Sequence, residues 1–405
     1  MRKIFYLILL LTLVISCDNE KSQESNTITF WHFWSEPYQQ NVIKEIVSNF
    51  EKEYNCRVIL TELSWNDGKT KLFAAFNSNT SPDVLELGSD WVAQFSSVGV
   101  LEELDNKDVN FGKFIEFSKK PSLFNNKIYA LPWIVDTRVL FINKDLHNQA
   151  VKNLNYPQTF DELLNNSIKI NSIKDKYGFG ANGPDRHRLY KKLVTLFWTY
   201  GGDILDKNTR PIINSNNNIE ALDMYVKLSR EGIIETQRQL DALFTEGKIG
   251  YTISGGWLIE KIKNENPSLN YDVSLIPSAK LPGISFAGGE YLAVSSKSKN
   301  KDLAIKFIKY MTDGKNSIEF CKKIIEAGFP ADSNYYRDKF YDQFPKRLKF
   351  AEQLNSSRMT PVHPKWLDLE TIIEEAAIEA LYGKKSSKEA LDDAQSKLES
   401  ILLVK

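Results

Sequence analysis

The chain has 405 residues, of which 42% are hydrophobic and 26% are charged. A chain of this length exceeds what one hydrophobic core usually serves, so we expect two lobes. Lysine plus arginine equals aspartate plus glutamate at 52 each, and the resulting net charge of zero argues against nucleic acid or another polyanion as a partner.

The first 17 residues have the pattern of an export signal. Arg2 and Lys3 precede the apolar run 4–11, which extends to residue 15 and is too short to span a membrane as a helix. The last four residues of the segment, Val-Ile-Ser-Cys, resemble a bacterial lipobox, in which the cysteine is diacylated and becomes the mature N-terminus. We therefore expect a lipid on Cys17 and a polar tether over 18–26. A plain signal peptide or an uncleaved anchor is the alternative.

The segment after the tether alternates between strand and helix patterns. The sequence predicts strands over 27–31, 57–63 and 83–87, an amphipathic helix after Pro37, and a helix over 69–77. Strands that alternate with helices predict a mostly parallel sheet. Ligands of such sheets bind beyond the carboxyl ends of the strands, which here means the loops 31–36, 64–68 and 88–91.

The middle of the chain, about 144–276, has an α/β pattern of its own. Thr159 is the expected N-cap of one helix, and apolar residues at helical spacing predict further helices over 218–230 and 302–311. Two helices separated by Gly383 are expected at the C-terminal end. The periodicity of apolar residues supports an α/β fold, but it does not indicate a function.

One glycine motif needs a specific interpretation. Residues 178–183, Gly-Phe-Gly-Ala-Asn-Gly, match the dinucleotide fingerprint, which requires a preceding strand and a helix that opens at the third glycine. Here a charged segment precedes the motif and Pro184 follows it. We interpret residues 178–183 as a loop between a strand and a helix, and not as a nucleotide site.

The sequence contains none of the catalytic or metal-binding motifs that we considered. The histidines lack zinc spacing, and neither a nucleophile elbow nor a phosphate-binding loop occurs. Cys56 and Cys321 have no metal-ligand spacing; we expect buried thiols, although export would permit a disulfide. We therefore expect no cofactor, no metal and no enzyme. The four histidines are His32, His147, His187 and His363.

An ordered set of motifs makes the chain recognisable from residue 27 to its end. They are Ser81-Pro-Asp-Val-Leu with Asp90-Trp91 and 95–105, Lys127-Ile-Tyr-Ala-Leu-Pro132 with Asp136-Thr-Arg138 and 141–145, Pro157-Gln-Thr-Phe-Asp-Glu-Leu163, Phe244-Thr-Glu-Gly-Lys248 with Gly255-Gly-Trp257, and Phe286-Ala-Gly-Gly289 with 292–295. The set resembles the bacterial family 1 extracellular solute-binding proteins, which include maltose-binding protein.

The resemblance implies an α/β periplasmic-binding-protein fold with two lobes and three hinge crossings. These crossings are expected near 137–140, 286–291 and 327–333. Lobe one would then comprise 27–137 plus 291–328, and lobe two 140–286 plus 333–405. Lobe closure around a ligand is a hinge motion that a few residues absorb.

The resemblance also implies a ligand site between the lobes. A pyranose has C–H patches on its faces and hydroxyls at its edge, so it needs flat aromatic rings together with carboxylate or amide acceptors. Packing is the alternative for Trp34 and Trp366, helix capping for Asp90, and pairing with Asp136 for Arg138. The expected ligand-binding residues are Trp34, Glu36, Asp90, Asp136, Arg138, Trp198, Gly256, Trp257, Glu290 and Trp366.

The sequence as a whole predicts an extracytoplasmic, lipid-anchored receptor that binds a sugar or oligosaccharide and delivers it to the transmembrane subunits of an ABC importer. A monomer is expected, attached to the membrane only through its N-terminal lipid. Two alternatives stay open: a receptor for a polyol phosphate or other non-sugar solute, and a cell-envelope lipoprotein that acts enzymatically on glycans.

Overall fold

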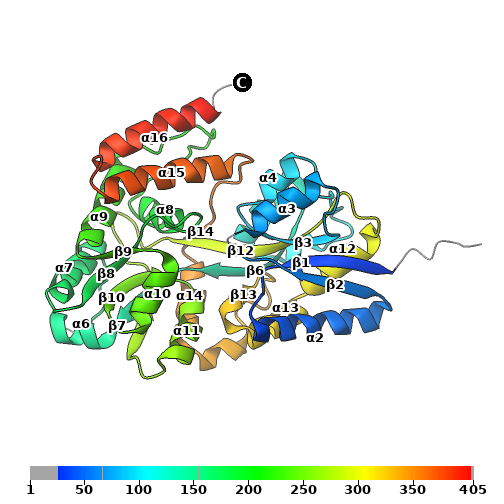
Figure 1. The fold of residues 1–405 in the computed structure, drawn as a ribbon, viewed down its shortest axis with the longest axis horizontal. Helices are drawn as coiled ribbons and strands as arrows, with labels where there is room; N and C mark the ends of the chain where they lie inside the picture. Colours follow the sequence, from blue (N-terminus) through cyan, green and yellow to red (C-terminus); the bar gives the residue numbers. More distant parts are fainter. Residues whose placement is uncertain (1–25, 66, 153–154, 403–405) are drawn as a thin grey trace, which may run out of the picture.

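The computed structural model describes residues 26–65, 67–152 and 155–402. The predicted signal, Cys17 and nearly all of the tether lie outside these residues. Two β-sheets organise the molecule, and each is covered by helices on both faces (Figure 1). We call the seven-stranded sheet with its helices lobe one, and the five-stranded sheet with its helices lobe two. The predicted α/β, two-lobed fold is confirmed.

Lobe one combines a parallel N-terminal unit with antiparallel strands from later in the chain. Its sheet has the order β13-β6-β12-β3-β1-β2, and β14 pairs with the first two residues of β12. Its elements are β1 (Thr27–His32), α2 (Pro37–Tyr54), β2 (Arg57–Glu62), α3 (Gly68–Asn77), β3 (Val84–Gly88), α4 (Val92–Ser97), α5 (Glu116–Lys119), β4 (Leu123–Phe124), β5 (Lys127–Ile128), β6 (Leu131–Thr137), β12 (Ser285–Val294), α12 (Lys301–Met311), α13 (Gly314–Lys323) and β13 (Phe329–Pro330).

The three parallel strands of lobe one position the loops that matter for function. Strand β1 pairs in parallel with both β2 and β3, so their carboxyl ends lie at one edge of the sheet. The three predicted strands and the helix after Pro37 are therefore confirmed. The segments 33–36, 63–65 and 89–91 follow these strand ends at the same edge of the sheet, where the sequence predicts the ligand loops.

Lobe two is built from the middle and the end of the chain. Its sheet has the order β11-β7-β10-β8-β9, in which β10, β8 and β9 are parallel. Its elements are β7 (Val139–Asn143), α6 (Lys144–Val151), α7 (Phe160–Asn171), β8 (Tyr177–Asn182), α8 (Leu189–Thr199), α9 (Asn216–Arg230), β9 (Gly232–Glu235), α10 (Gln237–Thr245), β10 (Ile249–Ser254), α11 (Trp257–Glu265), β11 (Tyr271–Ser274), α15 (Trp366–Leu381) and α16 (Ser387–Leu402).

The loop predicted at the glycine motif is wrong, because residues 177–182 form the buried strand β8. A Cβ atom at Gly178 would lie 2.1 Å from the carbonyl oxygen of Ser167 on α7 and 2.5 Å from that of Glu231. Glycine therefore allows helix α7 and the start of β9 to approach the strand backbone closely. The motif serves packing inside lobe two.

Two elements connect the lobes besides the β6–β7 junction. Strand β12 pairs with β6 and β3 of lobe one, while its first residue, Ser285, donates a hydrogen bond to the carbonyl of Arg138 at 2.8 Å. Helix α14 (Pro345–Leu354) packs against β6 and β12 as well as β7 and β11. Short helical turns at 111–113, 120–122, 325–327 and 339–343, and strand β14 (Ser357–Arg358), complete the described chain.

The predicted N-cap of the helix after Thr159 is confirmed. The Thr159 side chain accepts a hydrogen bond from the backbone of Glu162 at the start of α7. Cys56 and Cys321 are free thiols; Cys321 is buried as expected, whereas Cys56 is only partly buried. Within residues 26–402, apart from the three undescribed positions, no helix has the length and hydropathy that crossing a membrane requires.

Candidate functional site

The candidate site lies where the carboxyl edge of the lobe-one sheet faces lobe two. Asp90 follows β3 at this edge, and Glu290 of β12 pairs with Gly88 at the end of the same strand. On the lobe-two side, helix α8 and the start of α15 supply the opposing residues. Hydrogen bonds and charge interactions connect these two sides of the site, which we call its lobe-one and lobe-two walls.

Asp90 makes a direct contact between the lobes. The Tyr190 hydroxyl on α8 donates a hydrogen bond to Oδ2 of Asp90 at 3.1 Å. Helix capping, the alternative role for Asp90, is wrong, because the N-cap of α4 is Trp91 and no side chain caps this helix. The Asp90 carboxylate is therefore directed across the interlobe space. Burial and the neighbouring Asp90 carboxylate raise the pKa of Tyr190 well above its ordinary value.

Arg138 binds Asp136 at the junction of β6 and β7. Its Nη1 donates to Oδ2 of Asp136 and, at 3.1 Å, to the carbonyl of Thr137. The guanidinium also lies over the indole of Trp257, 4.6 Å from the ring centroid. Pairing with Asp136, the alternative role for Arg138, is thus present in the structure. Because the Nε of Arg138 is buried without a hydrogen-bond partner among the described residues, a ligand acceptor could bind there as well.

Trp257 is held in place from two sides. Its indole N–H donates to Oδ2 of Asp241 at 2.8 Å. A Cβ atom at Gly255 would lie 2.0 Å from Cζ3 of the indole, so only glycine leaves room for the ring. At Gly256 the neighbour is Nη1 of Arg347, 3.0 Å from a built Cβ atom. The structure thus places an arginine where we expected a ligand to approach Gly256.

Glu290 is a carboxyl without a polar partner in the described chain. Its side chain is half-buried and forms neither a hydrogen bond nor an ion pair with the described residues, although Asp136, Arg138 and Lys191 lie close enough to interact with its charge. Burial, followed by the nearby Asp136 carboxylate, raises the pKa of Glu290 well above its usual range. A protonated carboxyl at this position can both donate to and accept from a hydroxyl group.

Two lysines bring positive charge to the same space. The Lys69 ammonium on α3 is buried without a hydrogen-bond partner and lies 5.3 Å from the centroid of the Trp91 ring. Burial lowers the pKa of Lys69 to about 8, and the Asp90 carboxylate opposes this shift. Lys191 on α8 lies 5.3 Å from the ring centroid of Phe286. Burial, followed by the nearby Arg138 guanidinium, lowers its pKa.

An aromatic shelf of Phe33, Trp65 and Trp91 forms the lobe-one rim. Trp65 stacks on Phe33, with ring centroids 4.1 Å apart and an interplanar angle of 19°, and its edge contacts Trp91 at 5.5 Å. Trp65 is 38% exposed, an unusual value for a tryptophan, and its loop follows β2 at the site edge. The shelf offers a flat apolar face to a ligand.

A buried acidic cluster lies behind Tyr190. The His187 ring nitrogen Nδ1 is 2.5 Å from Oε1 of Glu370 on α15, and this hydrogen bond is the largest cause of the raised pKa of His187. The backbone N–H of Tyr190 donates to Glu374 at 3.1 Å. Burial raises the pKa of Glu374 to about 7. These contacts fix the start of α8 against α15.

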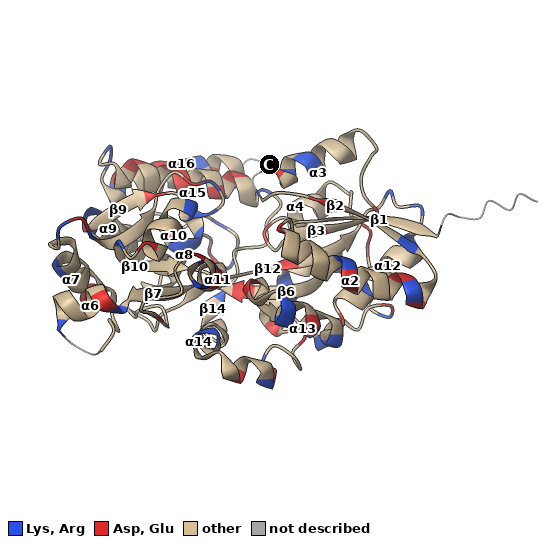
Figure 2. Ribbon diagram, turned by 60° about the horizontal axis from the view of Figure 1, so that its bottom comes forward, with Lys and Arg blue, Asp and Glu red and all other residues tan. Residues whose placement is uncertain are grey.

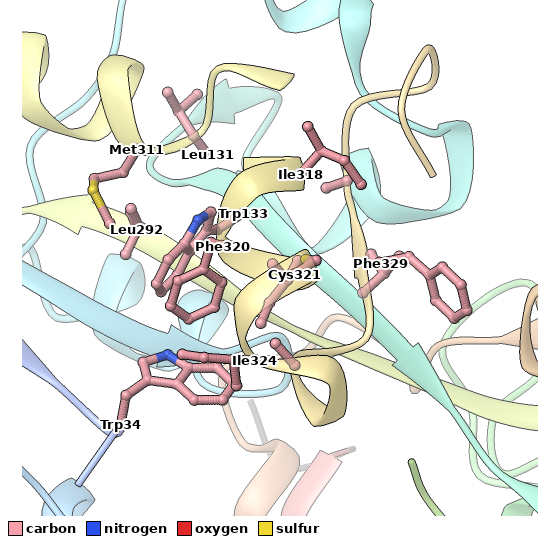
Figure 3. Close-up of a cluster of buried hydrophobic side chains, with 14 of the residues drawn as sticks. Trp34, Leu131, Trp133, Leu292, Met311, Ile318, Phe320, Cys321, Ile324 and Phe329 are labelled. Atoms are coloured by element: carbon pink, nitrogen blue, oxygen red, sulfur yellow. The ribbon is translucent and has the colours of Figure 1, made fainter. Parts of the chain in front are cut away.

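Three of the predicted tryptophans are packed in the cores of the lobes. The prediction for Trp198 is wrong: its ring is 1% exposed in the lobe-two core, and its N–H donates to Asp203 at 3.1 Å. Trp366 is equally buried and contacts Tyr190 edge-on, so it supports that residue from behind. Trp34 lies against Phe320 and Trp133 in the cluster shown in Figure 3. The packing alternatives hold for Trp34 and Trp366.

Glu36 begins helix α2 and is exposed. Its backbone N–H donates to the side chain of Gln39 at 3.2 Å, and its side chain accepts from the backbone N–H of Gln39, so the two residues form a capping box. This local contact explains the residue without a ligand. A ligand contact of Glu36 stays a prediction.

Charge is distributed evenly over the molecule. Acidic and basic positions are interspersed on both lobes in Figure 2.

The comparisons with known proteins bear directly on this arrangement. The sequence profile of the bacterial extracellular solute-binding proteins matches residues 35–316. The chain belongs to this family. The resemblance found in the sequence motifs is confirmed.

Individual relatives of this solute-binding protein match along most of its length. It is 29% identical over 380 residues to the galactooligosaccharide-binding protein of Bacillus subtilis, covering 89% of this chain and 86% of that one. A Brucella abortus binding protein is 28% identical over 353 residues, which cover 84% of each chain. The GacH receptor of Streptomyces glaucescens has the same fold, with a TM-score of 0.83, 23% identity and coverage of 93% and 98%.

Several residues of the candidate site in this solute-binding protein were not predicted from the sequence. The periodicity of an element shows which of its faces is buried, but it does not show which residues face the other lobe. For this reason the sequence did not predict Trp65, Lys69, Tyr190 and Lys191. The sequence did offer one indication for Trp65, because this residue lies in the loop 64–68, which was predicted to lie at the ligand-binding edge of the sheet.

Proposed function

We propose that the protein is the non-catalytic receptor of an ABC importer, and that it binds a sugar or oligosaccharide between its lobes. The observation that carries this proposal is the combination of an exposed aromatic shelf at Trp65 with unpaired polar groups on the facing walls. Such a combination matches the apolar faces and hydroxyl edges of a pyranose. Relatives described as galactooligosaccharide-binding and maltodextrin-binding support a saccharide as the ligand class.

The test is calorimetric titration of the purified protein with a panel of mono- and oligosaccharides. We expect binding of at least one saccharide with 1:1 stoichiometry. Failure of every sugar and polyol to bind would overturn the substrate class. Sustained turnover of a bound glycan, lost in the Asp90→Asn or Glu290→Gln variant, would instead favour a glycan-processing enzyme.

We further propose that lobe one comprises 27–137 plus 291–328 and lobe two 140–286 plus 333–405. The position of Arg138 between β6 and β7 supports the first boundary. Residues 287–290 and 329–330 pair with β6, so at the other two crossings the sheet of lobe one extends a few residues beyond the proposed bounds. The lobes would close on the ligand by hinge bending, and the importer's transmembrane subunits would bind the closed form preferentially. Small-angle X-ray scattering of the protein with and without ligand tests this closure. If the lobes close, the radius of gyration is expected to be smaller when ligand is bound.

The protein would act outside the cytoplasm as a monomer, anchored by a lipid on Cys17. The charge and apolar length of residues 1–17 support export, and a relative described as a solute-binding lipoprotein supports anchoring. Metabolic labelling with a fatty acid is expected to mark the wild-type protein and not the Cys17→Ala variant. A labelled Cys17→Ala variant would contradict this assignment.

A further inference from the structure

A buried polar network lies behind Trp257 in lobe two. The Asp241 carboxylate on α10 accepts a hydrogen bond from the Trp257 indole N–H at 2.8 Å. It also accepts from the Gln237 amide at 2.8 Å and from the Ser254 hydroxyl at 3.1 Å. The Gln237 amide oxygen in turn accepts from the Lys192 ammonium group on α8 at 2.5 Å. The other four side chains are buried, whereas Trp257 is partly exposed at the candidate site.

Stability alone does not explain this network. Lys192 and Asp241 carry opposite charges inside lobe two, and the Gln237 amide lies between them in the chain of hydrogen bonds. A buried charge loses its hydration, so apolar residues of similar volume are often equally or more stabilising at such positions. What a buried polar network provides is a defined geometry. Here it fixes the edge of the indole that bears the N–H group.

The orientation of the Trp257 ring determines the surface on which Arg138 packs. The Arg138 guanidinium lies 4.6 Å from the centroid of this ring and binds Asp136. Its Nε atom is buried without a hydrogen-bond partner among the described residues. Because Arg138 lies at the junction of β6 and β7, the network reaches the space between the lobes through side-chain contacts.

Gln237 also holds a second part of the lobe-two wall. Its backbone N–H, at the start of α10, donates to Oδ2 of Asp185 at 2.7 Å. The carbonyl of Asp185 accepts from the backbone N–H of Leu189, the first residue of α8, at 3.2 Å. Tyr190, the next residue, makes the interlobe hydrogen bond to Asp90. Both lobe-two contacts with the site are therefore connected to one network.

We propose that Asp241, held by Gln237, is a positioning residue of the ligand site: it does not touch the ligand, but it holds the Trp257 ring under Arg138 and so preforms the lobe-two wall. This inference rests on the proposed function. A side chain that already has its bound orientation loses less conformational entropy when a ligand binds, and affinity is higher for this reason. Removing the acceptor at residue 241 therefore weakens binding without removing a ligand contact.

The experiment is calorimetric titration of the Asp241→Leu variant with glucose, galactose, maltotriose and galactotriose. We expect each saccharide that binds wild type to bind this variant about tenfold more weakly. In the Trp257→Phe background, which keeps an aromatic ring but has no indole N–H, the same substitution is expected to cost no further affinity. Asp203→Asn is the matched control, because Asp203 accepts from the Trp198 indole N–H at 3.1 Å in the lobe-two core. It is expected to lower the thermal unfolding temperature and to leave affinity unchanged.

The indole N–H resonances in a ¹⁵N–¹H NMR spectrum report on the ring without a ligand. The Trp257 resonance is the one that is missing from the spectrum of Trp257→Phe. We expect Asp241→Leu to shift it upfield, because a hydrogen bond to a carboxylate is lost, and Asp203→Asn to leave it in place. If Asp241→Leu fails to fold, as judged by thermal unfolding, Asp241→Asn removes the charge but keeps one acceptor oxygen, and we expect a smaller shift and a smaller loss of affinity in the same directions.

The outcomes separate this inference from the proposed function. Wild-type affinity of a folded Asp241 variant, an unshifted Trp257 resonance, or an equal loss of affinity in the Trp257→Phe background would overturn the positioning role and leave a sugar receptor. Binding of no saccharide by wild type would overturn the proposed function, and the resonance would still show whether Asp241 orients the Trp257 ring.

Discussion

The Tyr190 hydroxyl donates a hydrogen bond to the Asp90 carboxylate at 3.1 Å, and this bond joins helix α8 of lobe two to the loop after β3 of lobe one. It connects the two walls of the candidate site directly. The two lobes are therefore in contact through residues of the candidate site.

The Tyr190→Phe variant tests this contact. Loss of one interlobe hydrogen bond is expected to disfavour the closed form by about 1 kcal/mol and to weaken ligand binding about fivefold. The control is Tyr225→Phe, which removes a hydrogen bond of 3.1 Å to the Asn182 carbonyl inside lobe two. We expect Tyr225→Phe to lower the thermal unfolding temperature without changing ligand affinity, and Tyr190→Phe to lower ligand affinity. Equal affinities of both variants would contradict an interlobe role.

Substitution of two tryptophans is expected to affect different properties, ligand affinity for Trp65 and the free energy of unfolding for Trp198. Trp65→Ala removes an exposed ring and is expected to weaken saccharide binding about tenfold with little loss of stability. Trp198→Ala removes a ring that is 1% exposed, so unfolding by denaturant should show a loss of about 3–5 kcal/mol. A Trp65→Ala variant with unchanged affinity would exclude the shelf from the site.

The Gly255→Ala variant is expected to displace Trp257. The added Cβ atom would lie 2.0 Å from the indole, and the ring would have to leave Asp241 and Arg138. Tryptophan fluorescence should change and ligand affinity should fall. Gly99→Ala is the control: Gly99 has φ +72° and no neighbour within 4 Å of a built Cβ atom, so only about 1 kcal/mol of backbone strain is expected.

Glu86 makes stability depend on pH. Burial raises its pKa to about 8, while the backbone N–H of Phe33 donates to its Oε2 at 2.9 Å. The folded protein thus retains a proton that the unfolded chain releases near its ordinary pKa. Stability is therefore expected to fall as pH rises from about 5 to about 8, by an amount on the order of a few kcal/mol.

The Glu86→Gln variant should lack this component of the pH dependence and be more stable than wild type at pH 8. Urea unfolding at a series of pH values measures the effect. Glu62→Gln, at an exposed residue that ends β2, should keep the wild-type profile. A profile of Glu86→Gln identical to wild type would show that Glu86 does not hold the proton.

Local sequence patterns predicted the elements well and the glycine segment poorly. The strand β1, the helix α2 and the N-cap Thr159 follow from periodicity and hydrogen-bonding groups within a few residues. The strand β8 was missed because its glycines resemble turn residues. Its glycines are needed for close approach by α7 and β9, which are distant in sequence.

The sequence by itself determined the α/β class, the export pattern and the family, because each depends on short-range order or on motifs in a fixed succession. It also predicted Asp90, Asp136, Arg138 and Glu290 as ligand contacts because they follow or flank strand ends, and the structure brings these four residues to the candidate site. The tertiary structure alone decided which rings face the site. Trp198 and Trp65 look alike in sequence, but burial depends on what packs against each ring from elsewhere in the chain: α8 turns Trp198 into the lobe-two core, whereas the loop after β2 leaves Trp65 at the rim.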